Sequence, residues 1–374
     1  MSVGHSAEHD ELRQVVREFL SEKSPTSEVR RLMEAGETRD KAVWAQLTGQ
    51  LGLSGIAVPD QYGGAGYGPV ELGIVLEETG RALLVAPYFA TVALAGQALA
   101  ASGDEDAMAR WLPGIADGSL TAALAFAEDS GSWDRGEVTA TAEPAGDGWA
   151  VTGTKLFVVD GDTAGLLLVV ARAPDGLGVF AIEPAAVEPC TVERARLDTL
   201  DMTRALASVT LRAAPATRVA VGRDATEWLS EVTGLVLTAM AAEQIGGAAQ
   251  CLDLAVEYAK VREQFGRPIG SFQAIKHKCA NLLLEVECGR SAVYHASAAV
   301  AERQPDAALA AALAYACCSQ AFTHAAKECI QIHGGIGYTW EHDAHLYLRR
   351  AKSSELLFGP PARHRTRLAE LTGI

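Results

Sequence analysis

The sequence has fewer basic residues than acidic ones: its 32 lysines and arginines and its 47 aspartates and glutamates give a net charge of −15. Nucleic acids and anionic membranes need a basic face on the protein that binds them, so this charge argues against both kinds of partner. A phosphorylated small molecule stays compatible with the composition, because a few local arginines are enough to hold one.

Long apolar runs, paired cysteines and internal repeats are also missing. The longest apolar run, residues 307–318, is alanine-rich and too short to span a bilayer, and the first residues carry no apolar signal core. None of the seven cysteines belongs to a C-x-x-C pair, and most lie in apolar stretches with a helical pattern. We therefore expect buried, reduced thiols in a soluble cytoplasmic protein.

With 374 residues, the chain exceeds a single core of ordinary size, and its hydrophobic periodicity changes twice. Ser6 is a suitable N-cap for a helical region that continues, with breaks, to about Leu112. Short strand-like runs follow, such as residues 166–170 and 206–211, and helical stretches return at 227–262, 272–302 and 306–332. The pattern predicts an α+β protein, mostly α, with an N-terminal helical domain (1–121), a central β domain (122–224) and a C-terminal helical-bundle domain (225–374).

Two segments place glycine where a helical pattern stops. Residues 262–273 read REQFGRPIGSFQ, and residues 331–338 read QIHGGIGY. Glycine lets the backbone approach a large anionic cofactor closely and leaves its N–H groups free to bind it. A single glycine after a helix is usually only a C-cap, but two such segments in one chain are much more specific.

Together with the loop 62–66 (YGGAG) and the strand-like segment 153–157 (GTKLF), these segments resemble the acyl-CoA dehydrogenase flavoprotein family. The resemblance covers nearly the whole chain, because the order of the three units also matches. It implies a helical N-terminal domain, a central β-barrel-like domain and a C-terminal four-helix bundle. It also implies FAD-dependent α,β-dehydrogenation of an acyl-CoA thioester, with an electron-transferring flavoprotein as electron acceptor.

In this family, the two segments hold the adenosine and pyrophosphate of a FAD whose ring lies mainly in the neighbouring subunit. Arg262 is a permanent cation suited to a pyrophosphate oxygen, and Gln331 offers an amide donor and acceptor. The alternative is that Arg262 pairs with Glu257 or Glu263 on a solvated helix face. The cofactor-binding residues that the resemblance implies are Arg262, Gln264, Phe265, Gln331, Gly334, Gly335 and Phe157.

The residues expected around the flavin ring differ from the family pattern. Relatives typically read TEPxAGSD where residues 127–134 read AEDSGSWD. Ala127 and Trp133 therefore occupy the two positions at which relatives carry a hydroxyl. The family's Trp-x-Thr is represented by residues 157–159 (FVV): Phe157 can stack on a ring, but Val159 cannot bond its N5 region. A ring edge left without a donor loses about 1–3 kcal/mol.

The catalytic carboxylate is missing as well. The reaction needs a carboxylate that takes the α-proton of the thioester. Relatives place it at the position of Phe358 or, in a smaller group, at that of Val236. Glu243 is the nearest acid of interest, because it lies in an apolar run on the same helix as Val236. It is either a base with a raised pKa or a structural glutamate bonded to a backbone amide or an arginine, and we favour the structural role.

Residues 341–345 (EHDAH) bring acids and imidazoles close together, but a metal site needs further ligands from elsewhere, so we expect no metal. Family members usually carry an acid at the position of Arg350. We expect the chain to be a partner subunit in an α2β2 heteromer that oxidises steroid or other bulky acyl-CoA substrates. The alternatives are a self-sufficient homotetramer that uses Glu243 and a flavin-free acyl-CoA-binding or structural protein.

Overall fold

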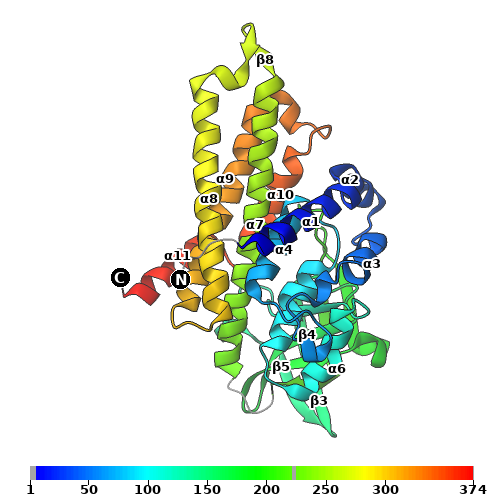
Figure 1. Cartoon of the computed structure of the whole chain (residues 1–374). Coiled ribbons are helices and arrows are strands. Elements are labelled where there is room, and N and C mark those ends of the chain that lie inside the picture. The colour runs from blue at the N-terminus through cyan, green and yellow to red at the C-terminus, as the bar shows by residue number, and fades with distance from the viewer. Residues whose placement is uncertain (1–5, 221–224, 374) are drawn as a thin grey trace. The chain divides into compact units, whose positions relative to one another are not determined.

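The computed structural model describes residues 6–220 and 225–373, and their contacts divide the chain into two compact units. Residues 6–31, 73–84 and 237–373 form the first, which we call the helical unit. Residues 32–72 and 85–236 form the second, the sheet unit, apart from the undescribed residues 221–224. Figure 1 shows the helices and strands that make up both units.

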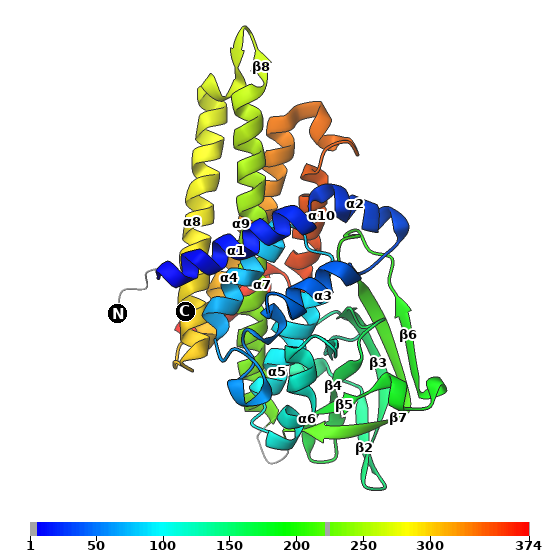
Figure 2. The same cartoon turned by 45° about the vertical axis from the view of Figure 1, so that its right-hand side comes forward.

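Long helices dominate the helical unit. Its elements are α1 (Ala7–Lys23), parts of α2 (Thr26–Ala35), α4 (Pro69–Arg81) and α7 (Ala225–Val261), and all of α8 (Gln273–Ala301), α9 (Ala307–His333), α10 (Ala344–Leu357) and α11 (Pro361–Thr372). The helices α7, α8, α9 and α10 lie side by side in Figures 1 and 2. Ser6 caps α1 by accepting a hydrogen bond from the backbone of His9, as its side-chain oxygen allows.

The helix α4 crosses α7 at close range because both helices carry glycine at the crossing. A Cβ on Gly80 would lie 2.0 Å from the carbonyl oxygen of Glu243, and one on Gly246 would lie 1.8 Å from that of Glu77. Ion pairs surround the crossing: Glu77 pairs with Arg13 of α1 at 2.7 Å and with Arg290 of α8 at 2.8 Å. The N-terminal helix is thereby tied to the C-terminal bundle.

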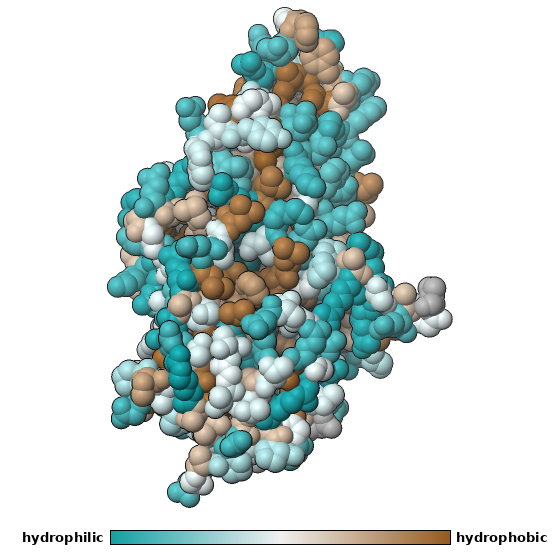
Figure 3. Space-filling view, turned by 180° about the vertical axis from the view of Figure 1, so that it is seen from behind, coloured by the Kyte–Doolittle hydropathy of each residue, from teal (hydrophilic) through white to brown (hydrophobic). Residues whose placement is uncertain are grey.

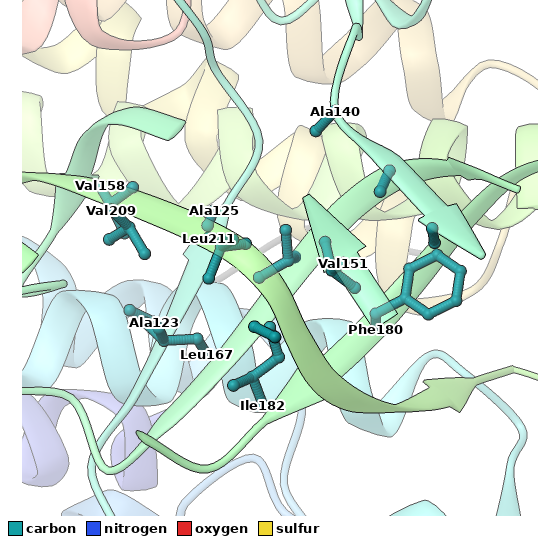
Figure 4. Close-up of a cluster of buried hydrophobic side chains, with 14 of the residues drawn as sticks. Ala123, Ala125, Ala140, Val151, Val158, Leu167, Phe180, Ile182, Val209 and Leu211 are labelled. Carbon is teal, nitrogen blue, oxygen red and sulfur yellow. The ribbon is translucent and has the colours of Figure 1, made fainter. Parts of the chain in front are cut away.

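The sheet unit is built around a closed set of strands (Figure 2). Its strands are β1 (Ala122–Ala125), β2 (Thr141–Ala145), β3 (Gly148–Val159), β4 (Leu166–Ala173), β5 (Gly176–Ile182), β6 (Val192–Arg196) and β7 (Leu206–Val219). The pairing order β4-β2-β3-β7-β5 returns to β4, which closes a barrel, while β1 pairs with β4 and β6 pairs with β7. Val151, Leu167, Phe180 and Val209 fill its interior (Figure 4).

Shorter helical segments complete the sheet unit. They are α3 (Lys41–Gly49), a π-helix (Phe89–Gly96), α5 (Gln97–Ala100), α6 (Glu105–Ala116) and the 3-10 turns Leu53–Gly55, Asp60–Tyr62, Arg135–Glu137, Pro184–Ala186 and Pro189–Thr191. The glycine-rich loop 62–66 needs its small residues, because a Cβ on Gly64 would lie 2.0 Å from the carbonyl oxygen of Val58.

The predicted fold class is confirmed: the chain is mostly helical, with helices on either side of a central barrel in the sequence. The domain boundaries after residues 121 and 224 stay a prediction, since the contacts group residues 6–31 and 73–84 with the C-terminal helices. Of the described helices, α7 is long and apolar enough to cross a membrane by composition alone, but 89% of its apolar window is buried, as in the core helix of a globular domain.

The expectation of buried thiols is wrong for three cysteines. Cys190, Cys288 and Cys317 are exposed, whereas Cys251, Cys318 and Cys329 are buried, and all seven cysteines are free thiols. Cys288 and Cys317 lie on outward faces of α8 and α9. A thiol is small and weakly polar, so an apolar neighbourhood in the sequence does not fix which face of a helix it occupies.

Candidate functional site

The segment 262–268 forms a hairpin at one end of the helical unit (Figure 1). Its strands are β8 (Glu263–Gln264) and β9 (Arg267–Pro268), and the two turn residues, Phe265 and Gly266, have φ values of 54° and 76°. Positive φ at both positions is the geometry of a type I′ turn, which glycine adopts freely and phenylalanine does not. Phe265 is nevertheless 91% exposed. A strained, exposed aromatic residue points to a binding role rather than to a role in folding.

The guanidinium of Arg262 is free for a ligand. Within the described chain, the side chain is exposed and has no hydrogen-bond or ion-pair partner, although its backbone carbonyl accepts a 2.7 Å bond from Ile269. The alternative pairing with Glu257 is not observed, because Glu257 pairs with Lys260 at 2.5 Å. The side-chain amide of Gln264 donates to the neighbouring carbonyl of Glu263 at 2.9 Å.

The second glycine segment lies at the same end of the unit, where α9 ends and the 3-10 turn Gly334–Tyr338 begins (Figure 1). Gln331 lines a cavity of about 530 Å³ together with Lys278, Lys327 and Tyr338. Gly334 has a φ of 64°, and a Cβ on Gly334 or Gly335 would meet nothing within 4 Å. The chain itself therefore does not require glycine at 335, and the open backbone leaves room for a molecule from outside.

Taken together, this end of the helical unit offers a free cation, exposed amides, an aromatic face and open glycine backbone. Apolar side chains also gather at the hairpin end in the space-filling view (Figure 3). Such groups fit the adenosine–pyrophosphate half of FAD: Arg262 toward a phosphate, Gln331 toward a polar edge and Phe265 toward a flat ring.

A buried cysteine–histidine cluster fixes the turn beside Gln331. The His333 ring lies 4.3 Å from that of Tyr258 and 4.0 Å from that of His342, and its Nδ1 lies 2.7 Å from the carbonyl oxygen of Cys329. The hydrogen bond from Cys251, and then the one with His333, lower the pKa of the Cys329 thiol. We did not predict this cluster, although the spacing of Cys329 and His333 places them one helical turn apart.

The residues expected around the flavin ring lie in the sheet unit and offer little polarity. Ala127 and Val159 are buried, and Val159 is paired with Leu206 in the sheet. Trp133 stacks on Phe126, with the ring centroids 4.7 Å apart and the planes at 6°. Tryptophan has no hydroxyl, so this position offers none to a ring edge.

Phe157 is the most exposed of the residues that we expect around the flavin ring, which also include Ala127, Trp133 and Val159. It is 39% exposed, has a φ of 56° and lies in the irregularity of β3 between Lys155 and Val158. A bulge re-aims a side chain out of the regular alternation of a strand. Phe157 is therefore available for stacking, but the hydrogen-bonding residues that relatives place around it are replaced by apolar ones. The described ring-side residues do not fit a fully bonded flavin ring.

Sequence reasoning missed Lys155 as the residue that holds the segment 126–128. Its fully buried ammonium group donates to the carbonyl of Phe126 at 3.0 Å and to Glu128 at 2.7 Å. Burial alone raises the pKa of Glu128, but the hydrogen bonds from Lys155, Thr139 and Ala140 outweigh it and lower that pKa to about 2. The signal for this buried pair was a charged residue, Lys155, in a strand whose other residues are uncharged.

Neither usual base position holds an acid, and both are buried: Phe358 is 4% exposed and Val236 is 1% exposed. Glu243 is also buried, and its Oε1 accepts a hydrogen bond from Nη1 of the buried Arg350 at 3.0 Å. This contact is the one expected of a structural glutamate. It supports that role, which stays a prediction.

The acid–histidine segment 341–345 is bound within the chain. Arg30 of α2 donates to Asp343 and to the carbonyl of Trp340, both at 2.6 Å. In the part of the chain that the structure describes, no group of three or more histidine, cysteine or acidic residues is placed to hold a metal ion. Asp343, one of the two acids of this segment, neutralises Arg30.

Known families and proteins agree with this architecture. A family model described as acyl-CoA dehydrogenase, N-terminal domain, matches residues 6–119, and one described as acyl-CoA dehydrogenase, C-terminal domain, matches residues 238–372. The acyl-CoA dehydrogenase IpdE2 of Mycolicibacterium smegmatis is 35% identical over 363 residues, which cover 97% of this chain and 98% of that protein.

Two solved structures of related proteins are similar over nearly the whole chain. The Tcur3481–Tcur3483 steroid ACAD has a TM-score of 0.88 and 32% identity, and the alignment covers 98% of each chain. The ChsE4–ChsE5 complex from Mycobacterium tuberculosis has a TM-score of 0.90 and 27% identity, and the alignment covers 100% of this chain and 99% of that one.

Proposed function

Because the chain belongs to the acyl-CoA dehydrogenase family, we propose that it takes part in FAD-dependent α,β-dehydrogenation of an acyl-CoA thioester as a partner subunit. In this role it binds the adenosine and pyrophosphate of a FAD whose ring lies in a second, homologous subunit, which also carries the base. We call the residues that bind this half of FAD the cradle: Arg262, Gln264, Phe265, Gln331, Gly334 and Gly335. One observation carries the proposal: Arg262 and Gln331 are exposed and have no side-chain partner among the described residues, whereas Ala127, Trp133, Val159 and Phe358 stand where ring-bonding or proton-accepting groups are needed.

The chemistry explains why this asymmetry matters. FAD, when bound, accepts the β-hydride, and a carboxylate must take the α-proton at the same time. Phe358 and Val236 have no group that can take a proton. The contribution of this chain is binding energy instead: Arg262 of the hairpin holds negative charge, and Gln331 at the end of α9 orients a polar edge beside the open backbone of Gly334 and Gly335.

Two similar structures support an assembly of unlike subunits, since one is a steroid ACAD named for two proteins and the other is the ChsE4–ChsE5 complex. By this likeness we propose an α2β2 tetramer with one FAD at each unlike interface. A steroid or another bulky acyl-CoA is the proposed substrate, an electron-transferring flavoprotein the proposed acceptor, and the cytoplasm the proposed location.

The test compares the full chain purified alone with the chain co-expressed with a homologous, base-bearing neighbour. We expect little FAD and poor acyl-CoA oxidation from the lone chain, and stoichiometric FAD with turnover from the complex. Full flavin occupancy and normal turnover in the lone homomer would favour the homotetramer that uses Glu243. A complex without flavin absorbance would favour a binding or structural protein.

Arg262→Ala tests the cradle itself, in the complex. Losing a charged hydrogen bond costs roughly 1.5–3 kcal/mol, so FAD affinity should fall by about one to two decades. Arg31→Ala is the matched control, because Arg31 is an exposed arginine of the same unit that pairs with Glu28 at 2.7 Å. Unchanged FAD affinity in a folded Arg262→Ala complex would remove the cofactor assignment.

A further inference from the structure

A histidine side chain joins the two ends of the connection between α9 and α10, residues 334–343. The His342 ring lies 4.0 Å from that of His333, the last residue of α9, with the ring planes at 46°. Its Nδ1 accepts a hydrogen bond of 3.1 Å from the backbone N–H of Ala344, the first residue of α10. We call these two contacts of His342 the clasp, because together they close the connection.

The hydrogen bond from Ala344 requires a neutral imidazole. Asp343 is the N-cap residue of α10, but its side chain accepts no capping hydrogen bond, so the acceptor at this helix start is the ring of His342. Amides of a first helical turn have no intrahelical acceptor, and a side chain that accepts from one stabilises the helix. An imidazole nitrogen accepts only while it carries no proton, and both nitrogens carry one in the charged ring. Protonation of His342 therefore removes this bond.

Most of the groups that face His342 also oppose a positive charge on its ring. Arg30 of α2 donates to Asp343 and to the carbonyl of Trp340 in the same connection, both at 2.6 Å. His333 faces the ring from α9, and the start of α10 presents the positive end of a helix dipole. Asp343 is the opposing acid, but it already pairs with Arg30. Burial, and then the charges of His333 and Arg30, lower the pKa of His342.

A second imidazole, that of His345, lies in the first turn of α10. Neither of its ring nitrogens has a hydrogen-bond partner among the described residues, and its ring packs edge-on against that of Trp340 at 4.6 Å. Burial, and then the charges of Arg30 and Arg349, lower the pKa of His345. His345 thus resists protonation as His342 does, but it accepts no hydrogen bond that a proton could break. A test therefore has to separate the two imidazoles.

We propose that His342 is a pH-sensitive clasp: its neutral ring holds the end of α9 to the start of α10, and its protonated ring releases the connection. Because folding lowers the pKa of His342, the clasp stabilises the connection fully above the unfolded pKa near 6.5, and this stabilisation is lost as the pH falls through the folded pKa. The clasp itself does not depend on the function proposed above. Its consequence for a cofactor does, because Gly334 and Gly335 of the cradle lie in this connection.

The test is hydrogen–deuterium exchange of the full chain at about pH 7.5 and about pH 5, on either side of the ordinary histidine pKa, with each rate divided by the intrinsic rate of the amide at that pH. We expect the start of α10 to exchange roughly twofold to thirtyfold faster at the lower pH, as for the loss of a helix cap. The start of α3 is the internal control, because Asp40 caps it with a carboxylate instead of an imidazole. Its protection should be equal at the two pH values.

Two substitutions identify the group responsible. His342→Asn keeps an acceptor for the Ala344 amide, since asparagine bonds the backbone two residues on, and it does not titrate, so the connection should stay protected at both pH values. His342→Phe keeps a ring against His333 but has no acceptor, so the connection should exchange fast at both. Equal protection of the unchanged chain at both pH values would overturn the clasp. An unaltered pH response in His342→Asn would also overturn it and assign the response to His345.

The consequence for the cofactor is measured in the proposed complex, as FAD affinity at the same two pH values. The affinity should fall on acidification by up to the same factor, and His342→Asn should abolish the fall. Unchanged FAD affinity while the connection opens would overturn the link between the clasp and the cradle. A complex that binds no FAD at either pH contradicts the function proposed above instead and leaves the exchange result standing.

Discussion

The buried pair of Glu243 and Arg350 offers the sharpest test of what Glu243 does. Arg350 is 2% exposed in its side chain and Glu243 is 6% exposed, and they meet at 3.0 Å. Removing one partner of a buried pair leaves the other charge uncompensated, which costs roughly 3–5 kcal/mol. Either Glu243→Met or Arg350→Met should therefore destabilise the helical unit by this amount.

That loss is a large part of the stability of a typical domain, about 5–15 kcal/mol. With an m-value of about 5 kcal/mol per molar guanidinium, the unfolding midpoint of each single variant should fall by roughly 0.6–1 M. The double variant Glu243→Met/Arg350→Met should recover most of this, because apolar side chains replace a buried ion pair at little net cost.

Kinetics of the proposed complex complete the test. Glu243→Gln keeps the shape and most of the bonding, so the flavin-loaded complex should keep most of its turnover. A fall of several decades in the chemical step, with flavin still bound and the fold intact, would identify Glu243 as the base and refute the structural role. Single variants whose effects simply add in the double variant would also refute it, since an ion pair is a coupling between its two members.

Two further predictions concern packing and buried charge. Lys155→Met should destabilise the sheet unit by about 3 kcal/mol, because it removes the cation from Glu128. The pKa of Glu128 is lowered to about 2 in the folded protein. The stabilisation that comes from ionised Glu128 is therefore complete above its unfolded pKa near 4.5 and is lost as the pH falls toward 2. Denaturant titrations between pH 5 and 2 should show this fall in the free energy of unfolding for the unchanged protein and a smaller fall for the variant. Gly80→Ala should cost at least about 1–3 kcal/mol, since its Cβ would lie 2.0 Å from the carbonyl oxygen of Glu243, whereas Gly335→Ala should leave the midpoint nearly unchanged.

The helices could be predicted because their signals are local. The predicted stretches 272–302 and 306–332 correspond closely to α8 (Gln273–Ala301) and α9 (Ala307–His333), and Ser6 caps α1 as expected. Apolar periodicity and caps act over a few residues, so one sequence reveals them. The glycine segments were found for the same reason, since each interrupts a helical pattern.

Contacts between distant residues could not be predicted in this way. Arg350 is 107 positions from Glu243, and sequence spacing gave no sign that the two would meet. The grouping of residues 6–31 with the C-terminal helices, the buried pair of Lys155 with Glu128, and the left-handed turn at Phe265 likewise depend on the assembled fold. The site residues named from the sequence stay predictions, although the exposure of Arg262 and Gln331 suits their proposed role.

The hairpin of β8 and β9 also has a consequence for how easily a protease can cut the chain outside the proposed complex. Exposed tips are the preferred places for protease attack. Arg262 is an exposed trypsin site at the base of this tip, whereas the bond after Arg267 is protected by the proline that follows it. If a second subunit and a shared dinucleotide cover the hairpin, assembly should shield the bond after Arg262 from trypsin, so limited proteolysis should cut the lone chain there faster than the assembled one.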